Sequence, residues 1–472
     1  MSNEFDTLIV NGRIPNFATD TFISAALALN DGCIEEIVDT TNEDRIDYLT
    51  HHASEVIDAK GHVVAPGFID VHMHEENLAE TDEYGIGRLM ARMGVTTCVA
   101  GNCGESPQDF QTFSQWVNSK GGAPVNYLIL AGYNSYRQSL GLGTYDKATP
   151  EQYRKAAALV REQIEAGCAG VSFGLEYDPG ITEEEMYEVV SAVADLDPFV
   201  SIHFRADCAD ARASLEEMAR LSRKTQVRVE ASHLSSLAGY GYMDEALAFI
   251  EQEMAENPQF GYDTYPYTAF STGIGSAVFD VDWRAKWGCD YDAIRFLYPP
   301  YRGQRATRET YEEVRSQHPE QNVVCFAMRE PEIEAAIVNS LGLVCSDGGV
   351  YAGEAHPRAA GSFPRVIARY VRGTKSLTLM QALKKMSLQA AKRLGLSATK
   401  GSIEPGKDAD IVIFDPELIE DGSTFDEPLK APVGIDRVLV GGVTVVKDGA
   451  DTGALSGCVL TGAGRHTEKT EG

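Results

Sequence analysis

The middle of the chain alternates between apolar runs and amphipathic segments. Apolar runs such as 95–100 (VTTCVA) and 198–204 (PFVSIHF) are typical of strands buried on both faces of a parallel sheet. Between them lie segments such as 153–167, whose apolar residues recur at the spacing of an amphipathic helix. Repeated across residues 66–394, this alternation predicts an α/β fold, and the number of repeats favours a (β/α)8 barrel over an open doubly wound sheet.

Both ends of the chain have a different pattern, with short β-segments separated by turn residues. The N-terminal stretches 5–14 and 22–38 contain Asn-Gly and Asn-Asp-Gly, which predict hairpin turns. The C-terminal stretch 434–449 again places short apolar segments around Gly-Gly and Asp-Gly. We therefore expect residues 1–65 and 395–472 to pair into one small β-domain beside the barrel domain. A chain of 472 residues also exceeds what one hydrophobic core usually organises.

Charge and composition narrow the class of protein. Lys and Arg total 41 against 70 for Asp and Glu, a formal charge of −29, so nucleic acid and anionic membranes are poor partners. No apolar run approaches the roughly 20 residues that span a bilayer, and the N-terminus lacks a secretory pattern, which predicts a cytoplasmic protein. The nine cysteines show no CxxC spacing, so neither a disulfide framework nor a zinc ribbon is indicated.

Four of the ten histidines lie at or just after the ends of apolar runs. His72 and His74 end GFIDVHMH, and two residues apart on a strand they point to the same face. His203 ends the run SIH, and His233 follows VRVEAS. The carboxyl ends of parallel strands meet at one rim of a barrel, where active sites form. One such histidine is more often structural, but four at three strand ends together predict a metal site.

Two further side chains occupy similar positions. Asp347 follows LGLVCS and precedes two glycines, where a carboxylate can coordinate a metal and accept a proton from water. By itself, an Asp in this setting is also a common turn residue. Cys103 follows the run VTTCVA by three residues, and a thiolate is a strong zinc ligand. The alternatives are a buried inert thiol and a nucleophilic cysteine, and the lack of a dedicated His-Asn pair argues against the nucleophile.

With these residues located, the chain resembles the amidohydrolase superfamily and, within it, the N-acyl-D-amino-acid deacylases (D-aminoacylases). The resemblance covers almost the whole chain. It is carried by nine motifs in the family's order: 65–74, 94–106, 170–180, 201–207, 230–234, 263–268, 345–349, 356–366 and 400–416. It implies a (β/α)8 barrel with a small β-sandwich formed by both chain ends. It also implies zinc-dependent hydrolysis of the amide bond of N-acyl-D-amino acids, which are small-molecule substrates.

The resemblance implies a metal-ligand set as well. A tighter zinc ion would be held by Cys103, His203 and His233. A second, weaker zinc position would be formed by His72, His74 and Asp347. Asp347 would also be the catalytic group that accepts the proton of the attacking water and passes it to the leaving amine.

The substrate's free carboxylate needs a fixed guanidinium and hydroxyl donors. Arg358, Tyr177 and Tyr267 are similar to the family's residues for this task, although Tyr265 and Tyr267 could equally be core aromatic residues.

Three departures from the family pattern concern substrate choice. Glu75 and Glu76 follow the HxH motif where members usually carry two aspartates, and these longer side chains could change the surroundings of the second metal. Ser235 stands where some members carry a lysine that contacts acidic side chains, so a D-glutamate-type substrate is less supported. Residues 269–325 have no clear match, and we expect a lid or insertion that decides which substrate binds.

Two alternatives remain open from the sequence. A cyclic-amide hydrolase of the dihydropyrimidinase or dihydroorotase type would use the same barrel, but those relatives usually carry a lysine at strand four, where this chain has Ser172. A barrel that acts only as a scaffold is the alternative from another class, and the retained histidines, Cys103 and Asp347 argue against it. An oligomer is compatible with the sequence.

Overall fold

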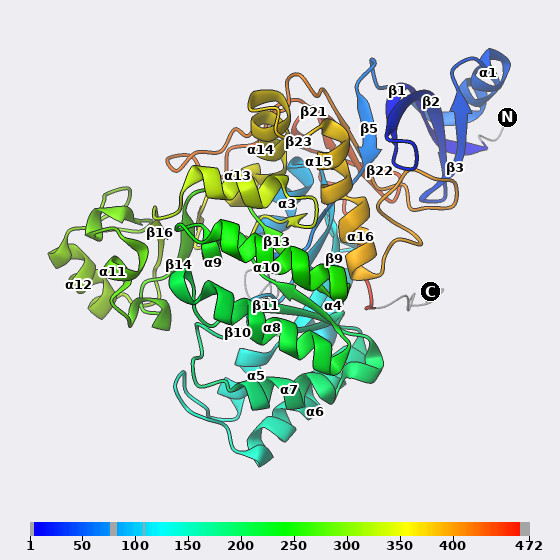
Figure 1. Ribbon diagram of the computed structural model, residues 1–472. Helices are drawn as coiled ribbons and strands as arrows, with labels where there is room; N and C mark the ends of the chain where they lie inside the picture. The colour runs from blue at the N-terminus through cyan, green and yellow to red at the C-terminus, as the bar shows by residue number, and fades with distance from the viewer. Residues whose placement is uncertain (1–3, 76–82, 107–108, 463–472) are drawn as a thin grey trace.

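A computed structural model describes residues 4–75, 83–106 and 109–462 (Figure 1). Its centre is an eight-stranded sheet in which each strand pairs parallel with the next. In spatial order the strands are β6 (Phe68–Asp70), β8 (Val95–Ala100), β9 (Asn126–Gly132), β10 (Gly170–Gly174), β11 (Phe199–His203), β12 (Arg228–Ala231), β13 (Phe260–Thr264) and β17 (Leu343–Val344). This arrangement confirms the predicted α/β barrel.

The barrel closes between its first and last strands at their carboxyl ends. The backbone N–H of Asp347 donates to the carbonyl of His72 at 2.8 Å. Just beyond, β7 (Met73–His74) pairs parallel with β18 (Gly348–Tyr351), which in turn pairs with β19 (Glu354–Ala355). This closure places the segments that carry His72, His74 and Asp347 side by side.

Helices follow most of the barrel strands and cover the outside of the sheet (Figure 1). Helix α6 (Pro150–Ala166) shows why the local sequence is helical, because Thr149 and Gln152 form a capping box, Pro150 occupies the first turn and Gly167 ends the helix. The other barrel helices are α3 (Gly85–Arg92), α4 (Phe110–Ser119), α5 (Tyr133–Ser139), α7 (Glu183–Ser191), α8 (Ala211–Thr225), α9 (Leu234–Ala238), α10 (Met243–Glu256), α13 (Glu330–Val338), α14 (Arg358–Arg365), α15 (Leu379–Met386) and α16 (Leu388–Leu394).

Strands from both chain ends pair into one further sheet of nine strands, as predicted. Its members are β1 (Phe5–Asn16), β2 (Thr21–Asn30), β3 (Cys33–Asp39), β4 (Ala53–Asp58), β5 (Val63–Pro66), β20 (Ile411–Phe414), β21 (Ile435–Val440), β22 (Val443–Lys447) and β23 (Ala450–Asp451). The antiparallel pairing of β5 with β20 joins the two ends. Alternate side chains of β2 enter two apolar clusters, one of them shared with β20 and the other facing α1 (Glu43–His52). The domain boundaries at 65/66 and 394/395 stay a prediction.

One predicted turn in this sheet is instead a bulge. The turn at Asp31 and Gly32 joins β2 to β3 with both residues at positive φ, as expected for a two-residue hairpin. Asn11 and Gly12 lie inside β1, where the register with β2 shifts. A Cβ at Gly12 would lie 2.5 Å from Val64 Cγ2, so the glycine lets two strands approach closely rather than turn the chain.

Residues 269–325 fold beside the barrel mouth and project from it (Figure 1). They form a small antiparallel sheet of β14 (Phe270–Gly273), β16 (Asn322–Cys325) and β15 (Ile294–Phe296), with helices α11 (Trp283–Trp287) and α12 (Arg308–Gln317). We call residues 269–325 the insertion. Across the described parts of the chain, no helix is both long and apolar enough to cross a membrane.

Candidate active site

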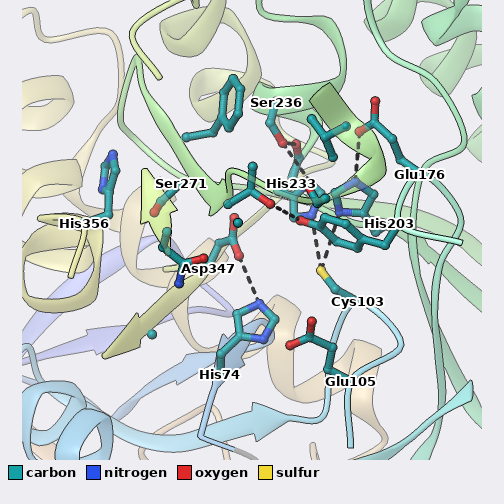
Figure 2. Close-up of a pocket in the computed structure, with 18 of the residues that line it drawn as sticks. His74, Cys103, Glu105, Glu176, His203, His233, Ser236, Ser271, Asp347 and His356 are labelled. Carbon is teal, nitrogen blue, oxygen red and sulfur yellow. Dashed lines mark hydrogen bonds and ion pairs between the residues drawn. The ribbon is translucent and has the colours of Figure 1, made fainter. Parts of the chain in front are cut away.

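A cavity of about 370 Å³ opens at the carboxyl ends of the barrel strands (Figure 2). Its floor carries side chains from several strand ends, including Cys103, His203, His233 and Asp347. The insertion supplies part of its wall, with Phe270 from β14 as one example. The cavity therefore lies where the sequence pattern predicts a site, between the barrel rim and the insertion.

Three of the predicted site residues have a strained backbone. Cys103, His233 and Asp347 have φ values of 54°, 38° and 50°, in the left-handed region that non-glycine residues rarely adopt. Such strain persists only where the surrounding structure enforces it, and it concentrates at functional sites. Each of these residues lies two or three positions after the end of a barrel strand, and the left-handed conformation turns the chain at the rim.

The sulfur of Cys103 lies among three imidazoles. Its Sγ is 3.4 Å from Nε2 of His72. It is also 3.6 Å from Nδ1 of His203 and 3.6 Å from Nε2 of His233. All four side chains are buried. The predicted ligands His203 and His233 therefore both face Cys103, and the structure adds His72, whose contact with Cys103 the sequence did not predict.

The predicted second set also comes together. Nε2 of His74 lies 3.3 Å from Oδ1 of Asp347, and Nε2 of His72 lies 3.6 Å from the same oxygen. Ligand atoms of His72, His74 and Asp347 all lie within 4.8 Å of one another, and so do those of His72, Cys103 and His233. His72 therefore stands between the two groups.

The charges of these side chains fit a bound divalent cation. Burial raises the pKa of the Cys103 thiol. The charge of His72 and hydrogen bonds with His203 and His233 outweigh this effect and lower the pKa to well below its ordinary value. Burial lowers the pKa of His72, yet contact with Cys103 and Asp263 raises it to about 10. The contact between Cys103 and His72 thus favours a thiolate beside a cation, and a metal ion would supply that positive charge in place of the proton. One thiolate with imidazoles is a donor set that zinc prefers.

Two residues that the sequence pattern did not identify contact the predicted ligands His72 and His233. Asp263, at the buried end of β13, accepts a hydrogen bond from the backbone N–H of His233 at 2.7 Å, and its other oxygen lies 3.7 Å from Nδ1 of His72. The hydroxyl of Ser236 lies 2.8 Å from Nδ1 of His233. A carboxylate inside the apolar run FGYDTYPY was the available signal for Asp263, because a buried Asp is rare without a specific partner.

Arg358 and Tyr177 line the same cavity. Nη1 of Arg358 lies 2.7 Å from Oδ2 of Asp347, and the guanidinium lies over the ring of Tyr265 at 4.8 Å. Its buried Nε–H has no hydrogen-bond acceptor among the described residues. The hydroxyl of Tyr177 accepts a hydrogen bond from Thr272 of the insertion at 3.3 Å. A guanidinium with a spare donor, beside a hydroxyl, can bind a ligand carboxylate.

The structure does not bring Tyr267 to this cavity. Its hydroxyl lies 3.4 Å from both Asp421 and Ser423, and its ring lies 4.6 Å from the guanidinium of Arg365. Tyr265 is the tyrosine that contacts Arg358. Tyr267 therefore fits the alternative interpretation, that of a core aromatic residue.

The structure places two of the residues that depart from the family pattern, Glu75 and Ser235. Glu75 accepts hydrogen bonds from the backbone N–H groups of Ile86 and Gly87 at 2.8 and 2.9 Å, so its carboxylate binds the start of α3. Glu76 lies outside the described residues. Ser235 is buried in α9 and is not among the residues that line the cavity.

Comparison with known proteins decides the family. A family model described as "Amidohydrolase family" matches residues 55–233 and 344–446. The first range contains the four histidines and Cys103, and the second contains Asp347 and Arg358. The chain belongs to this amidohydrolase family. The predicted resemblance is confirmed, and the gap in the match contains the insertion.

Similarity to individual amidohydrolases extends over nearly the whole chain. A D-aminoacylase from Alcaligenes xylosoxydans xylosoxydans is 29% identical over 97% of this chain and 98% of its own length. A solved D-aminoacylase with a binuclear metal centre superposes with a TM-score of 0.85 at 27% identity, covering 97% and 100% of the two chains. The N-acyl-D-glutamate deacylase of Bordetella bronchiseptica was solved in complex with zinc and a phosphonate inhibitor. It superposes with a TM-score of 0.83 at 28% identity, covering 97% of this chain and 99% of its own.

The likeness of this amidohydrolase to solved hydantoinases is a likeness of fold. The L-hydantoinase of Arthrobacter aurescens is 16% identical with a TM-score of 0.63. At the strand-four position, Ser172 accepts a hydrogen bond from the backbone N–H of Gly104 at 3.0 Å and donates to the carbonyl of Gly101. Ser172 thus fixes the loop that carries Cys103, which is a different use of this position from a metal-bridging lysine.

Proposed function

We propose that this amidohydrolase cleaves the amide bond of N-acyl-D-amino acids with water, releasing a carboxylate and a free D-amino acid. The observation that carries the proposal is the convergence of Cys103 and the histidines beside Asp347 and Arg358 in one cavity. Similarity to D-aminoacylase over nearly the full length of both chains supports the same reaction.

The tighter zinc ion would be held by Cys103, His203 and His233, and a second one by His72, His74 and Asp347. Zinc bound there supplies a Lewis acid that polarises the amide carbonyl and lowers the pKa of water to about 7. The solved D-aminoacylase is described as activated by one metal and attenuated by the second. The two overlapping groups of this chain, which share His72, are compatible with one activating and one attenuating metal position.

Asp347 carries the proton in this mechanism. Burial raises the pKa of its carboxyl, but Arg358, together with His233 and His74, lowers it to well below its ordinary value. The carboxylate is therefore ionised at neutral pH, as a general base must be. It accepts a proton from the attacking water and then delivers it to the amide nitrogen as the C–N bond breaks.

Arg358 would orient the substrate through its free carboxylate, with Tyr177 as a second polar contact. We expect Arg358→Lys to raise KM for N-acetyl-D-leucine about 10- to 100-fold, because a single ammonium cannot replace a two-pronged guanidinium contact. A substrate amide that lacks the carboxylate should show no such rise. Arg365→Lys is the matched control, since Arg365 lies against Tyr267 outside the cavity lining. Equal losses on both substrates would argue against carboxylate binding.

The cavity wall favours a neutral amino-acid side chain. Apolar side chains line it on the insertion side and the barrel side: Phe204, Tyr240, Phe270, Trp287 and Leu297. Carboxylates also surround it: Glu105, Glu176, Asp207 and Glu320. A substrate carboxylate entering this region would meet like charges, whereas an apolar side chain would be buried.

The proposal is tested with N-acetyl D- and L-forms of leucine, phenylalanine and glutamate, together with hydantoins, by measuring free amino acid. We expect kcat/KM for the D-leucine and D-phenylalanine substrates to be about 10- to 100-fold higher than for the D-glutamate substrate. This ratio corresponds to the free energy gained by burying one apolar side chain. Hydrolysis of hydantoins or of L-forms alone would contradict the proposal. The cytoplasmic location and the oligomeric state stay predictions.

A further inference from the structure

Helix α11 of the insertion contacts the barrel through two consecutive side chains. Nζ of Lys286 lies 3.0 Å from Oε1 of Glu176 and forms a second ion pair with Asp207. Nε1 of Trp287 donates to the other oxygen of Asp207 at 2.8 Å. Glu176 follows β10 and Asp207 follows β11, so this one short helix is bound to two neighbouring barrel loops.

The same Glu176 also contacts a predicted metal ligand. Its second oxygen, Oε2, lies 3.3 Å from Nε2 of His203, and the opposite ring nitrogen of His203 faces Cys103 (Figure 2). A continuous set of polar contacts therefore runs from Lys286 through Glu176 to His203. A carboxylate on the far nitrogen of a ligating histidine fixes the ring's orientation and its tautomer.

The ammonium of Lys286 compensates the negative charges of two barrel carboxylates, Glu176 and Asp207. Glu176 and Asp207 are 8% and 3% exposed, and both border the same cavity. Buried carboxylates need a cationic or hydrogen-bonding partner, because their desolvation is otherwise uncompensated. Without the ammonium of Lys286, repulsion between these carboxylates would move Glu176 away from its position beside His203.

We infer that Glu176 and Lys286 are positioning residues that set the orientation of the His203 imidazole, and that the insertion thereby supports the metal centre as well as the substrate wall. The inference rests on the proposed function, since it takes His203 as a zinc ligand. Trp287, next to Lys286, lines the cavity and packs at 5.0 Å, ring to ring, against Phe270. Helix α11 thus contacts both the cavity, through Trp287, and the carboxylate that pairs with His203, through Lys286.

The test compares Glu176→Gln, Lys286→Met and the double variant with the wild-type holoenzyme. We expect each single variant to bind zinc about 10- to 100-fold more weakly in competition with a chelator, the usual effect of losing such an outer partner. The visible spectrum of the cobalt(II)-substituted protein should also shift, because it reports the arrangement of ligands. Because Lys286 acts through Glu176, the double variant should bind zinc no more weakly than Glu176→Gln.

Three controls separate positioning from general damage. Arg284→Met removes a cation from the same helix, where Arg284 pairs with exposed Asp290, and should leave zinc affinity and the cobalt spectrum unchanged. Lys286→Arg keeps the charge and should restore most of the affinity. Thermal unfolding of every variant shows whether it is folded.

The outcomes distinguish this inference from the proposed function. Wild-type zinc affinity and an unchanged cobalt spectrum in both Glu176→Gln and Lys286→Met would overturn the inference. In the same series, His203→Ala should lose most of its zinc. If His203→Ala retains it, the assignment of His203 as a ligand fails, and the positioning role fails with it.

Discussion

Replacing Asp347 by Asn should reduce kcat for an N-acyl-D-amino acid by about 10²- to 10⁴-fold, the range for loss of a general acid–base group. The amide has nearly the same shape but cannot accept the proton of the attacking water. Zinc content should stay near the wild-type level, because Cys103, His203 and His233 do not depend on this carboxylate. The checks are steady-state kinetics and elemental analysis of the purified variant.

Asp421→Asn is the matched control for this substitution. Asp421 pairs with Arg365 at 2.9 Å and contacts Tyr267, away from the cavity lining, so its loss should leave kcat nearly unchanged. Near-normal turnover in Asp347→Asn would remove Asp347 from the mechanism. The structure would then need another base within reach of the attacking water.

Replacing Cys103 by Ala should release most of the bound zinc and abolish turnover. The thiolate is the only sulfur in the group, and three imidazoles surround it at 3.4, 3.6 and 3.6 Å. Removal of one of a few ligands from a structural or catalytic zinc site weakens binding strongly, because the remaining donors cannot complete the coordination. Zinc per chain, measured after exhaustive dialysis, gives the result directly.

Cys98→Ala provides the comparison on the same segment. Cys98 is buried on β8 and its Sγ lies 3.5 Å from the carbonyl oxygen of Asn126. Burial raises the pKa of this thiol well above its ordinary value, so it stays protonated and does not offer a ligand. This variant should keep its zinc even if it unfolds at a lower temperature. Full zinc in Cys103→Ala would mean that Cys103 is merely structural.

The sequence predicts the site well where strand ends decide it. His203 ends β11 itself, while Cys103, His233 and Asp347 follow β8, β12 and β17, so a parallel barrel brings them to one rim whatever the details of packing. The pattern could not predict which of these site side chains contact one another. His72 contacts both Cys103 and Asp347 because the first and last strands close the barrel, and that closure is a tertiary event.

Local geometry after a strand end is harder to predict. Tyr265 and Tyr267 are two residues apart and would share a face if β13 continued, but β13 ends at Thr264 and Pro266 separates them. Tyr265 consequently lies under Arg358 and Tyr267 under Arg365. In the same way, the spacing of Asn11 and Gly12 suggested a turn, whereas close packing against Val64 produces a bulge.

The insertion illustrates a different limit. Its lack of familiar motifs predicted a lid or insertion that decides substrate choice, and the structure places its residues in the cavity wall. The contact of Lys286 with Glu176 and Asp207 could not be predicted, because a helix of the insertion and two barrel loops carry these residues, and their meeting depends on how the insertion packs. If our proposals hold, substrate preference and support of the metal centre depend on one packing arrangement.

Removal and return of zinc test the central claim most directly. The protein is depleted of metal with a chelator, the loss is verified by elemental analysis, and release of D-leucine from N-acetyl-D-leucine is followed as zinc is added back. We predict no release from the depleted protein and a return of activity that rises with zinc bound at the first, tight position. Full release of D-leucine without metal would contradict the account, and so would a zinc-loaded protein that leaves the D-substrate intact.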